Sequence, residues 1–473
     1  MDDILYPPDS DLDLSFTSCT SAATATTFPS SSSARSSLAR SSLNLSFNES
    51  RLSSTTTSTS TTVPNSHARP HRKSDPHWSA IKAATTLSSD GTLHLRHLKL
   101  LRHLGSGNLG RVFLCRLRDN DHANFALKVV DKDSLTTKKL SHVQTEAQIL
   151  SSLDHPFLPT LYAHIEVSHY TCLLIDYCPN GDLHSLLRKQ PGYRLPLQSV
   201  RFYVSEILVA LEYLHALGFV YRDLKPENIL IREDGHIMLS DFDLCFNADV
   251  FPKLEKRTHV RKVGSRKSRK EVVTEFVAEP TTAFSRSCVG THEYLAPELI
   301  SGNGHGNGVD WWALGVLVYE LLYGTTPFKG GSKECTLRNI ASTRGVKFHH
   351  VAAEEEEGMA EARDLIEKLL VKDPRKRLGC AGGATDIKRH PFFDGIRWPL
   401  IRACRPPEVR GLAVKRSKQG HVSHVASPKR RLWWLKGLHY FMMRRNNKGS
   451  KHSLNPNPNY HCYCVSTKVR KCA

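Results

Sequence analysis

The hydrophobic pattern predicts its clearest helix in the second half of the chain. Residues 309–323 carry apolar side chains nearly all the way round, so this helix is expected to be buried on every side. Residues 197–217 place apolar side chains three and four positions apart, which predicts an amphipathic helix, and residues 360–370 predict another. The second half of the chain is therefore expected to be mostly helical.

The region before these helices has a different pattern. Residues 125–130 form an apolar run interrupted by Lys128, which predicts a strand, and residues 138–152 predict a helix that carries Glu146. The hydrophobic pattern therefore changes from a strand followed by one helix in this region to several helices in the second half.

The N-terminal region predicts no packed structure. Residues 1–90 are rich in Ser and Thr and poor in aromatic residues, and such a segment buries too little apolar surface to offset the entropy lost on ordering. We therefore predict a disordered region over 1–97. The sequence Ala-Arg-Ser-Ser-Leu occurs at 34–38 and again at 39–43, either as low-complexity drift or as an array of Arg-x-Ser phosphorylation sites.

A short polar loop carries the most specific chemical signal. Residues 221–228 read Tyr-Arg-Asp-Leu-Lys-Pro-Glu-Asn, and Asp241-Phe242-Asp243 follows. Phosphoryl transfer from ATP needs these groups: Asp223 can accept the proton of an attacking hydroxyl, while Asn228 and Asp241 can hold Mg²⁺ on the phosphates.

A glycine-rich turn precedes the predicted strand. Gly105, Gly107, Gly110 and Val112 fit the pattern G-x-G-x-x-G-x-V, in which glycine lets the backbone approach phosphates without a clashing Cβ. The pattern alone is weak, and a strand lysine alone is usually a solvated residue. Together with Glu146 on the next helix, the better interpretation is a Lys–Glu ion pair that holds the nucleotide phosphates.

With these motifs in place, residues 98–393 resemble a eukaryotic protein kinase domain. The resemblance implies an α+β fold with two lobes, a β-rich small lobe from 98 to 176 and a helical large lobe. Tyr221 in place of the usual His points to the AGC group, and Lys225 is typical of Ser/Thr kinases. Asp243 in place of Gly, a basic insertion and the N-terminal stretch 11–17 are similar to the plant kinases of the PINOID and WAG branch, closest to the WAG kinases.

The resemblance implies roles for further residues. Lys225 would stabilise the γ-phosphoryl group, and Arg377 would pair with Glu298 to brace the activation segment. Ser287 is the implied activation phosphosite, with Ser285 as the second candidate, and a phosphate there would pair with Arg222. Substrate recognition is implied for Asp182, Glu227 and Thr291. The family motif F-x-x-F at the C-terminus is absent here, which puts activation through that motif in doubt.

Charge favours an anionic partner. The net charge is +19, and the insertion 249–284 contains nine Lys or Arg and one acid between 253 and 270. This run is expected to project from the large lobe, either as an anionic-lipid patch, as a solvated surface or as a segment for nuclear import or nucleic-acid contact. The basic extension 394–473 includes cations beside Trp433 and Trp434, which suit a membrane interface. No apolar run is long enough to span a membrane.

The strongest functional hypothesis is a monomeric Ser/Thr protein kinase that uses ATP and Mg²⁺. A non-catalytic scaffold would typically lack Lys128, Asp223 or Asp241, and a nucleic-acid-binding protein would carry a recognisable module. The resemblance implies a basophilic enzyme that phosphorylates the cytosolic loops of PIN auxin efflux carriers and regulates auxin transport. The expected location is the cytoplasmic face of the plasma membrane, with the nucleus as the alternative.

Overall fold

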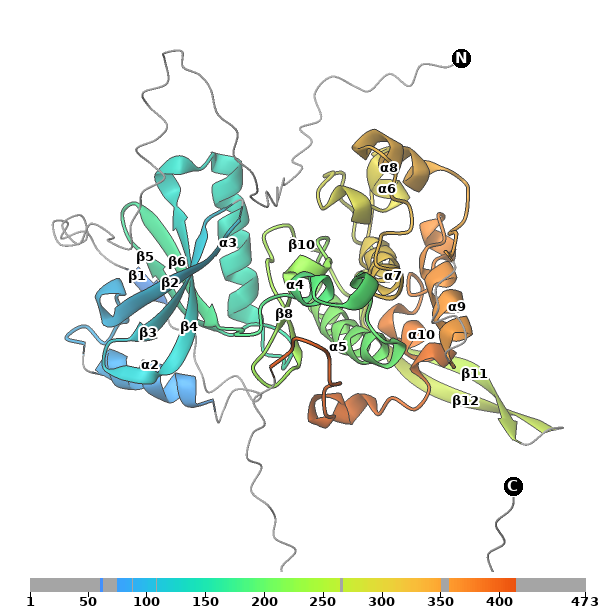
Figure 1. The fold of residues 1–473 in the computed structure, drawn as a ribbon, viewed down its shortest axis with the longest axis horizontal. Coiled ribbons are helices and arrows are strands. Elements are labelled where there is room, and N and C mark those ends of the chain that lie inside the picture. Colours follow the sequence, from blue (N-terminus) through green and yellow to red (C-terminus); the bar gives the residue numbers. More distant parts are fainter. Residues whose placement is uncertain are drawn as a thin grey trace, which may run out of the picture. The chain divides into compact units, whose positions relative to one another are not determined.

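The computed structural model describes residues 60–62, 75–86, 88–107, 109–263, 267–349 and 357–413. These residues form an α+β structure with two lobes, as predicted (Figure 1). Most of the predicted N-terminal tail and the segment 414–473, with Trp433 and Trp434, lie outside the described residues.

The small lobe is built on one antiparallel sheet. Its order is β1-β5-β6-β4-β3-β2, so the strands next to one another are mostly neighbours in sequence. The strands are β1 (Ser60–Thr62), β2 (Leu98–Ser106), β3 (Arg111–Leu117), β4 (Asn120–Asp131), β5 (Leu161–Glu166) and β6 (Tyr170–Asp176).

One helix of this lobe carries a buried acid. Helix α3 (Thr137–Ser152) begins after Thr136, whose side chain accepts a hydrogen bond from the Lys139 amide. Its buried face contains Val143 and Ile149, and Glu146 lies on the same face with 3% of its surface exposed. A buried carboxylate needs a partner, and the sheet supplies it in β4.

The structure differs from the predicted disorder in part of residues 1–97. Residues 60–62 form β1 at the edge of the sheet, paired with β5. Helix α2 (Pro76–Thr86) buries Trp78 and Ile81 in the same cluster as Tyr162, whose hydroxyl donates to Asp75 at 2.8 Å. The average composition of residues 1–90 did not predict this helix. One face of the helix, with Trp78 and Ile81, supplies the apolar area that the surrounding Ser and Thr residues lack.

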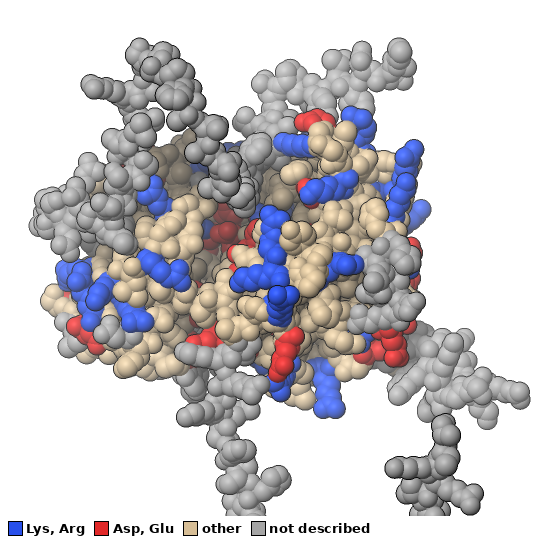
Figure 2. Space-filling view, in the orientation of Figure 1, with Lys and Arg blue, Asp and Glu red and all other residues tan. Residues whose placement is uncertain are grey.

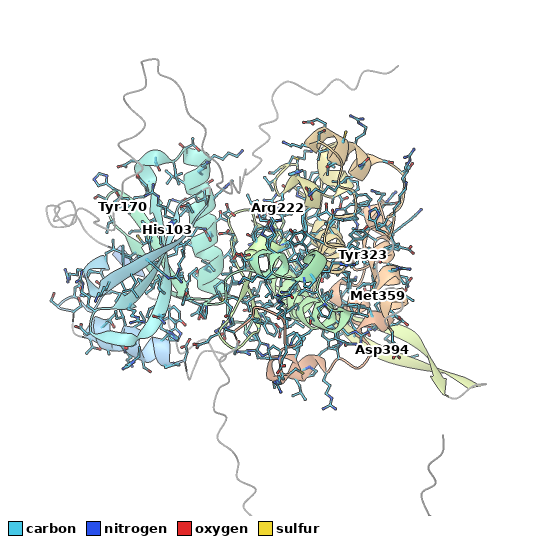
Figure 3. All side chains as sticks on the ribbon, in the orientation of Figure 1. His103, Tyr170, Arg222, Tyr323, Met359 and Asp394 are labelled. Atoms are coloured by element: carbon cyan, nitrogen blue, oxygen red, sulfur yellow. The ribbon has the colours of Figure 1, made fainter. Side chains whose placement is uncertain are left out.

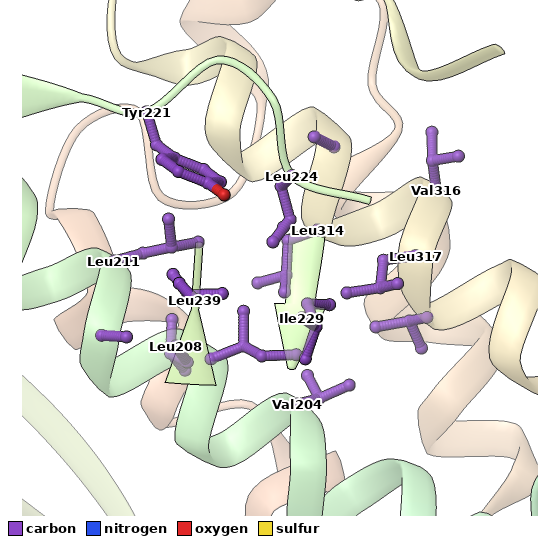
Figure 4. Packing of buried hydrophobic residues seen from close by; sticks show 14 of the residues in the cluster. Val204, Leu208, Leu211, Tyr221, Leu224, Ile229, Leu239, Leu314, Val316 and Leu317 are labelled. Carbon is purple, nitrogen blue, oxygen red and sulfur yellow. The ribbon is translucent and has the colours of Figure 1, made fainter. Parts of the chain in front are cut away.

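The large lobe contains the three predicted helices with ends within one residue of expectation. They are α5 (Leu197–Ala216), α7 (Gly308–Tyr323) and α9 (Met359–Leu369). Leu208 of α5 and Leu314 of α7 are fully buried in one cluster, as the apolar periodicity predicted (Figure 4). The remaining α-helices are α4 (Leu183–Arg188), α6 (Pro297–Ser301), α8 (Lys333–Ala341) and α10 (Gly383–Lys388).

Short elements connect these helices. Two-stranded pairs form between β7 (Phe219–Val220) and β10 (Phe246–Asn247), and between β8 (Ile229–Ile231) and β9 (Ile237–Leu239). The 3₁₀ helices are η4 (Leu95–His97), η5 (Lys132–Ser134), η6 (Pro191–Tyr193), η7 (Pro226–Asn228), η8 (His292–Tyr294), η10 (Pro374–Lys376), η11 (Pro391–Phe393) and η12 (Trp398–Ala403).

The basic insertion is a β-hairpin. Strands β11 (Lys253–Val263) and β12 (Lys267–Val277) pair antiparallel from Lys253↔Val277 to Val263↔Lys267. This β11–β12 ribbon projects from the large lobe, as expected of the insertion (Figure 1). The register of the two strands places Leu254 opposite Phe276, and both are largely exposed.

The first part of the predicted C-terminal extension packs onto the large lobe. Ile401 and Val409 are buried, and the Gln190 side chain donates to the Arg410 carbonyl at 2.8 Å. Among the described residues, no helix has the length and hydropathy that crossing a membrane requires.

Candidate active site

A lysine of β4 meets two carboxylates between the lobes. Lys128 Nζ donates to Glu146 at 2.7 and 2.8 Å and to Asp241 Oδ1 at 3.0 Å. Burial would lower the pKa of Lys128, but Asp241 and Glu146 outweigh it and raise the pKa above its usual value, so the lysine stays charged. The structure thus confirms the predicted Lys–Glu pair.

The glycine-rich turn closes over β4. The Gly107 amide donates to the Gly110 carbonyl at 2.9 Å, and a Cβ on Gly110 would lie 2.3 Å from the Val129 carbonyl oxygen. A Cβ on Gly105 or Gly107 would meet nothing within 4 Å. Gly110 is therefore needed for packing, whereas Gly105 and Gly107 have open space around them. The residue that pairs with Lys128 in β3 is Val112.

The catalytic-loop candidates form one hydrogen-bonded cluster. Asp223 Oδ2 accepts from Lys225 Nζ at 2.8 Å and from Asn228 Nδ2 at 2.7 Å, and Oδ1 accepts from Thr291 Oγ1 at 3.2 Å. Lys225 Nζ also donates to Thr291 Oγ1 at 3.1 Å. Burial raises the pKa of Asp223 to about 6, against the opposing effects of Lys225 and Asn228.

The backbone beside Asp223 is held in an unusual conformation. Arg222 has φ of 66°, a region that residues with a Cβ seldom adopt. Its amide donates to Asp310 Oδ1 at 2.7 Å, and the Tyr221 amide donates to Asp310 Oδ2 at 2.8 Å. Sequence reasoning missed Asp310 as a functional residue, although an Asp at the start of a nearly apolar helix was a visible signal.

The residues proposed for Mg²⁺ fit a hard cation. Asp241 has a carboxylate that is 51% exposed, and the charge of Lys128 lowers its pKa, so it is ionised. Asn228 turns its amide nitrogen toward Asp223, which leaves the amide oxygen on the opposite side. Mg²⁺ prefers oxygen ligands and takes the rest of its shell from water and phosphate. In the space-filling view, acidic side chains gather in the recess between the lobes (Figure 2).

The two acids predicted to recognise the substrate, Asp182 and Glu227, have different surroundings. Glu227 is exposed. Asp182 caps α4, because its carboxylate accepts hydrogen bonds from the Ser185 amide at 2.6 Å and from the Ser185 hydroxyl at 3.0 Å. Glu320, which sequence reasoning missed, accepts from the Tyr294 hydroxyl. Burial and the charges of Glu227 and Glu293 raise the pKa of Glu320 to about 7. An isolated acid in the apolar run 309–323 was the signal that could have found it.

The activation segment brings Ser285 to Arg222. Arg222 Nη1 donates to Ser285 Oγ at 3.3 Å, while Ser287 is exposed and its amide donates to Ser285 Oγ at 3.2 Å. Figure 3 shows Arg222 on the side of the large lobe that faces the small lobe. The arginine that was expected beside a phosphorylated Ser287 thus contacts the second candidate.

The predicted ion pair between Arg377 and Glu298 is present in the structure. Arg377 donates through Nη1 and Nη2 to the two carboxylate oxygens of Glu298 at 2.6 and 2.9 Å, and only 2% of its surface is exposed. Its Nη1 also donates to the Gly308 carbonyl at 2.8 Å. Such two-point pairs fix geometry as well as charge.

The fold and this constellation define a protein kinase. The protein kinase domain family matches residues 98–393, more than half of the chain, and the chain belongs to that family.

Comparison with curated proteins shows which group of protein kinases the chain resembles. The chain is 64% identical to the serine/threonine-protein kinase WAG1 of Arabidopsis thaliana, over 98% of this chain and 99% of the relative. It is 63% identical to WAG2 of the same plant, over 98% of both. Protein kinase PINOID of Oryza sativa subsp. japonica is 48% identical over 72% of this chain and 75% of its own length. The chain is therefore a plant AGC-group Ser/Thr protein kinase of the WAG and PINOID type.

Proposed function

We propose that this kinase transfers the γ-phosphoryl group of ATP through the cluster around Asp223. The observation that carries the proposal is the contact of Asp223 with Lys225, Asn228 and Thr291, which gathers a proton acceptor, a cation and a metal ligand at one point. Asp223 orients the substrate hydroxyl and takes its proton. Lys225 lies 2.8 Å from that carboxylate, where its charge offsets the charge on the moving phosphoryl group.

The remaining groups hold the nucleotide. Gly105 and Gly107 offer open backbone to the phosphates, and Lys128, oriented by Glu146, neutralises the α- and β-phosphate oxygens. Asn228 and Asp241 are the residues that would hold Mg²⁺. The bound cation would offset charge on the β- and γ-phosphate oxygens.

Removal of the proton acceptor tests this proposal. Asp223→Ala and Lys128→Ala are each expected to reduce phosphate transfer from radiolabelled ATP by roughly 10³-fold or more, while the fold is retained. Asp394→Ala, an Asp-to-Ala change at an exposed position, is the matched control with normal activity. Near-normal transfer by purified Asp223→Ala would refute the assignment.

We infer further that the substrates carry Arg before the target Ser or Thr. Support comes from Glu227, whose charge is close enough to Glu320 to raise the pKa of the Glu320 carboxyl. A substrate guanidinium would relieve this like-charge repulsion. The same resemblance that suggests Arg recognition implies PIN auxin carrier loops as substrates and auxin transport as the regulated process. Transfer to a purified PIN loop, compared with a loop whose Arg residues are changed to Gln, tests both points.

For location, we propose the cytoplasmic face of the plasma membrane, with the β11–β12 ribbon as the contact. Its exposed apolar pair, Leu254 and Phe276, stands on strands that carry most of the basic run. Basic residues near an anionic leaflet contribute about 1 kcal/mol each at short range. Nuclear import remains the competing hypothesis, and a monomer is the expected form. Imaging of a fluorescent fusion with a neutralised ribbon distinguishes the two locations, because only the membrane hypothesis requires loss of plasma-membrane signal.

A further inference from the structure

At its exit, the β11–β12 ribbon is anchored in the large lobe by buried residues. Glu279 follows β12 by two residues and is only 6% exposed, and Val277 is 2% exposed. On the entry side, Phe251 is 69% exposed. A carboxylate is costly to bury unless its charge is paired and hydrogen-bonded, so the burial of Glu279 indicates a dedicated set of partners.

The Glu279 carboxylate joins three parts of the large lobe. Oε2 lies 2.7 Å from His215 Nδ1 at the end of α5 and accepts from Asn307 Nδ2 at 2.9 Å, just before α7. Oε1 accepts from the Ala384 amide in α10 at 3.3 Å. A Cβ on Gly383 would lie 2.0 Å from Oε1, so glycine at that position gives the carboxylate its room.

The contact continues from Glu279 to the catalytic loop. His215 Nε2 lies 2.8 Å from Asp310 Oδ2, and Asp310 accepts the amides of Tyr221 and Arg222. Because a carboxylate faces each ring nitrogen, both nitrogens donate and His215 is an imidazolium. Burial would lower the pKa of His215, but the two carboxylates outweigh it and raise the pKa to about 10.

The catalytic loop depends on being held from this side. Arg222 has a positive φ, and such a conformation persists only where its surroundings impose it. The Asp310 carboxylate supplies two of those constraints, immediately before Asp223. The position of that carboxylate is set in turn by His215, which lies between Asp310 and Glu279.

We propose that Glu279 is a positioning residue for phosphoryl transfer, acting through His215 and Asp310 on the backbone that carries Asp223. The proposal rests on the proposed role of Asp223. It assigns to the exit of the insertion a part in catalysis that the projecting strands do not have.

Two substitutions separate this role from simple packing. Glu279→Gln keeps the shape and one acceptor oxygen but removes the charge, whereas Glu279→Leu removes every acceptor. With a soluble peptide, the Leu variant is expected to lower kcat per nucleotide-binding site by roughly ten- to hundred-fold, the range caused by a misplaced catalytic group. The Gln variant is expected to be intermediate, and KM for ATP is expected to be unchanged in both.

A pH profile gives a readout that packing alone does not move. Among the described residues, the charged groups that influence His215 are Glu279 and Asp310, and the Trp311 ring that packs against it is neutral. Loss of the Glu279 charge lets His215 lose its proton at lower pH. The ratio of kcat for Glu279→Gln to kcat for wild type is therefore expected to fall between pH 7 and pH 9, whereas a packing defect leaves that ratio constant.

The controls distinguish the possible failures. Glu367→Gln, the same change at an exposed position, is expected to match wild type at every pH. If folded Glu279→Gln also matches wild type in kcat and in pH profile, the proposal is overturned, and it is overturned equally if the ratio is reduced but flat. An active Asp223→Ala would instead overturn the proposed function on which it rests. Should Glu279→Leu fail to fold, Glu279→Gln alone decides.

Discussion

At the scale of single residues, the site works by fixing directions as much as charges. Thr291 shows this most clearly, since its hydroxyl donates to Asp223 and accepts from Lys225. One small side chain therefore sets the relative orientation of the proton acceptor and the neighbouring cation. No change of pKa is needed for this role, and the smallest change at this position should separate orientation from charge.

Thr291→Ala is expected to lower kcat by roughly ten- to hundred-fold, because a hydrogen bond to a charged group contributes about 1.5–3 kcal/mol. Thr291→Ser keeps the hydroxyl and is expected to remain within a few-fold of wild type. Steady-state kinetics on a Ser-containing peptide measure both variants. Equal rates for Ala and Ser would show that the hydroxyl does not orient the pair.

Glu320 supplies a pH-dependent prediction. Its pKa is raised to about 7 from its usual 4.5, so the carboxyl is largely neutral at pH 6 and ionised at pH 8. If Glu320 binds a substrate Arg, KM for an Arg-containing peptide is expected to fall several-fold as pH rises from 6 to 8. A peptide with Gln in place of Arg is the control, and Glu320→Gln is expected to remove the pH dependence. A KM that is flat for both peptides would contradict the proposed recognition.

At the scale of elements, apolar periodicity correctly predicted the helices that are buried in the core. Helix α7 was predicted because nearly all its residues are apolar, and the motif partners Arg377 and Glu298 were predicted to pair. Contacts between residues far apart in sequence left no local pattern. Glu279 meets His215 across 64 positions, and the ribbon strands were hidden within a run of charge. Helix α2 was missed for the opposite reason, since its few apolar residues were averaged with their surroundings.

The Arg377–Glu298 pair predicts an element-level cost. Arg377→Ala leaves Glu298 without its charge partner and is expected to destabilise the fold by about 3–5 kcal/mol, the usual cost of removing one partner of a buried pair. Arg375→Ala is the matched control, because Arg375 is 88% exposed and pairs with Asp373 at the surface. Denaturant unfolding of both variants checks this, and similar midpoints would exclude a bracing role.

At the scale of the whole molecule, the charge of the chain can be compared with the distribution of charged segments in the structure. Positive charge is spread over the chain, but the described structure separates part of it into a ribbon that leaves the large lobe (Figure 1). The acids of the site lie in the recess between the lobes (Figure 2). Attachment to a surface and transfer of phosphate are therefore assigned to separate places and should be separable by mutation.

Neutralising the ribbon tests that separation. Changing Lys256, Arg257, Arg261, Lys262, Arg266 and Lys267 to Gln is expected to abolish co-sedimentation with anionic liposomes while leaving activity on a soluble peptide unchanged. Wild-type binding should weaken with salt, because the Debye length is about 8 Å at physiological ionic strength. Neutral liposomes are the control. Liposome binding that does not depend on lipid charge would show that the ribbon is a solvated surface and not an anionic-lipid patch.

Helix α2 makes the folding unit longer than the family signature. The kinase match begins at residue 98, but Trp78 and Ile81 cover the outer surface of the small-lobe cluster that contains Tyr162. A recombinant fragment that begins at residue 98 would expose this apolar surface to water and would therefore tend to aggregate. Poor yield of such a fragment would then reflect where it was cut, and starting at residue 75 is the remedy. The same reasoning makes the stretch before the signature a site where inherited variants can disable the enzyme without touching any residue that defines it.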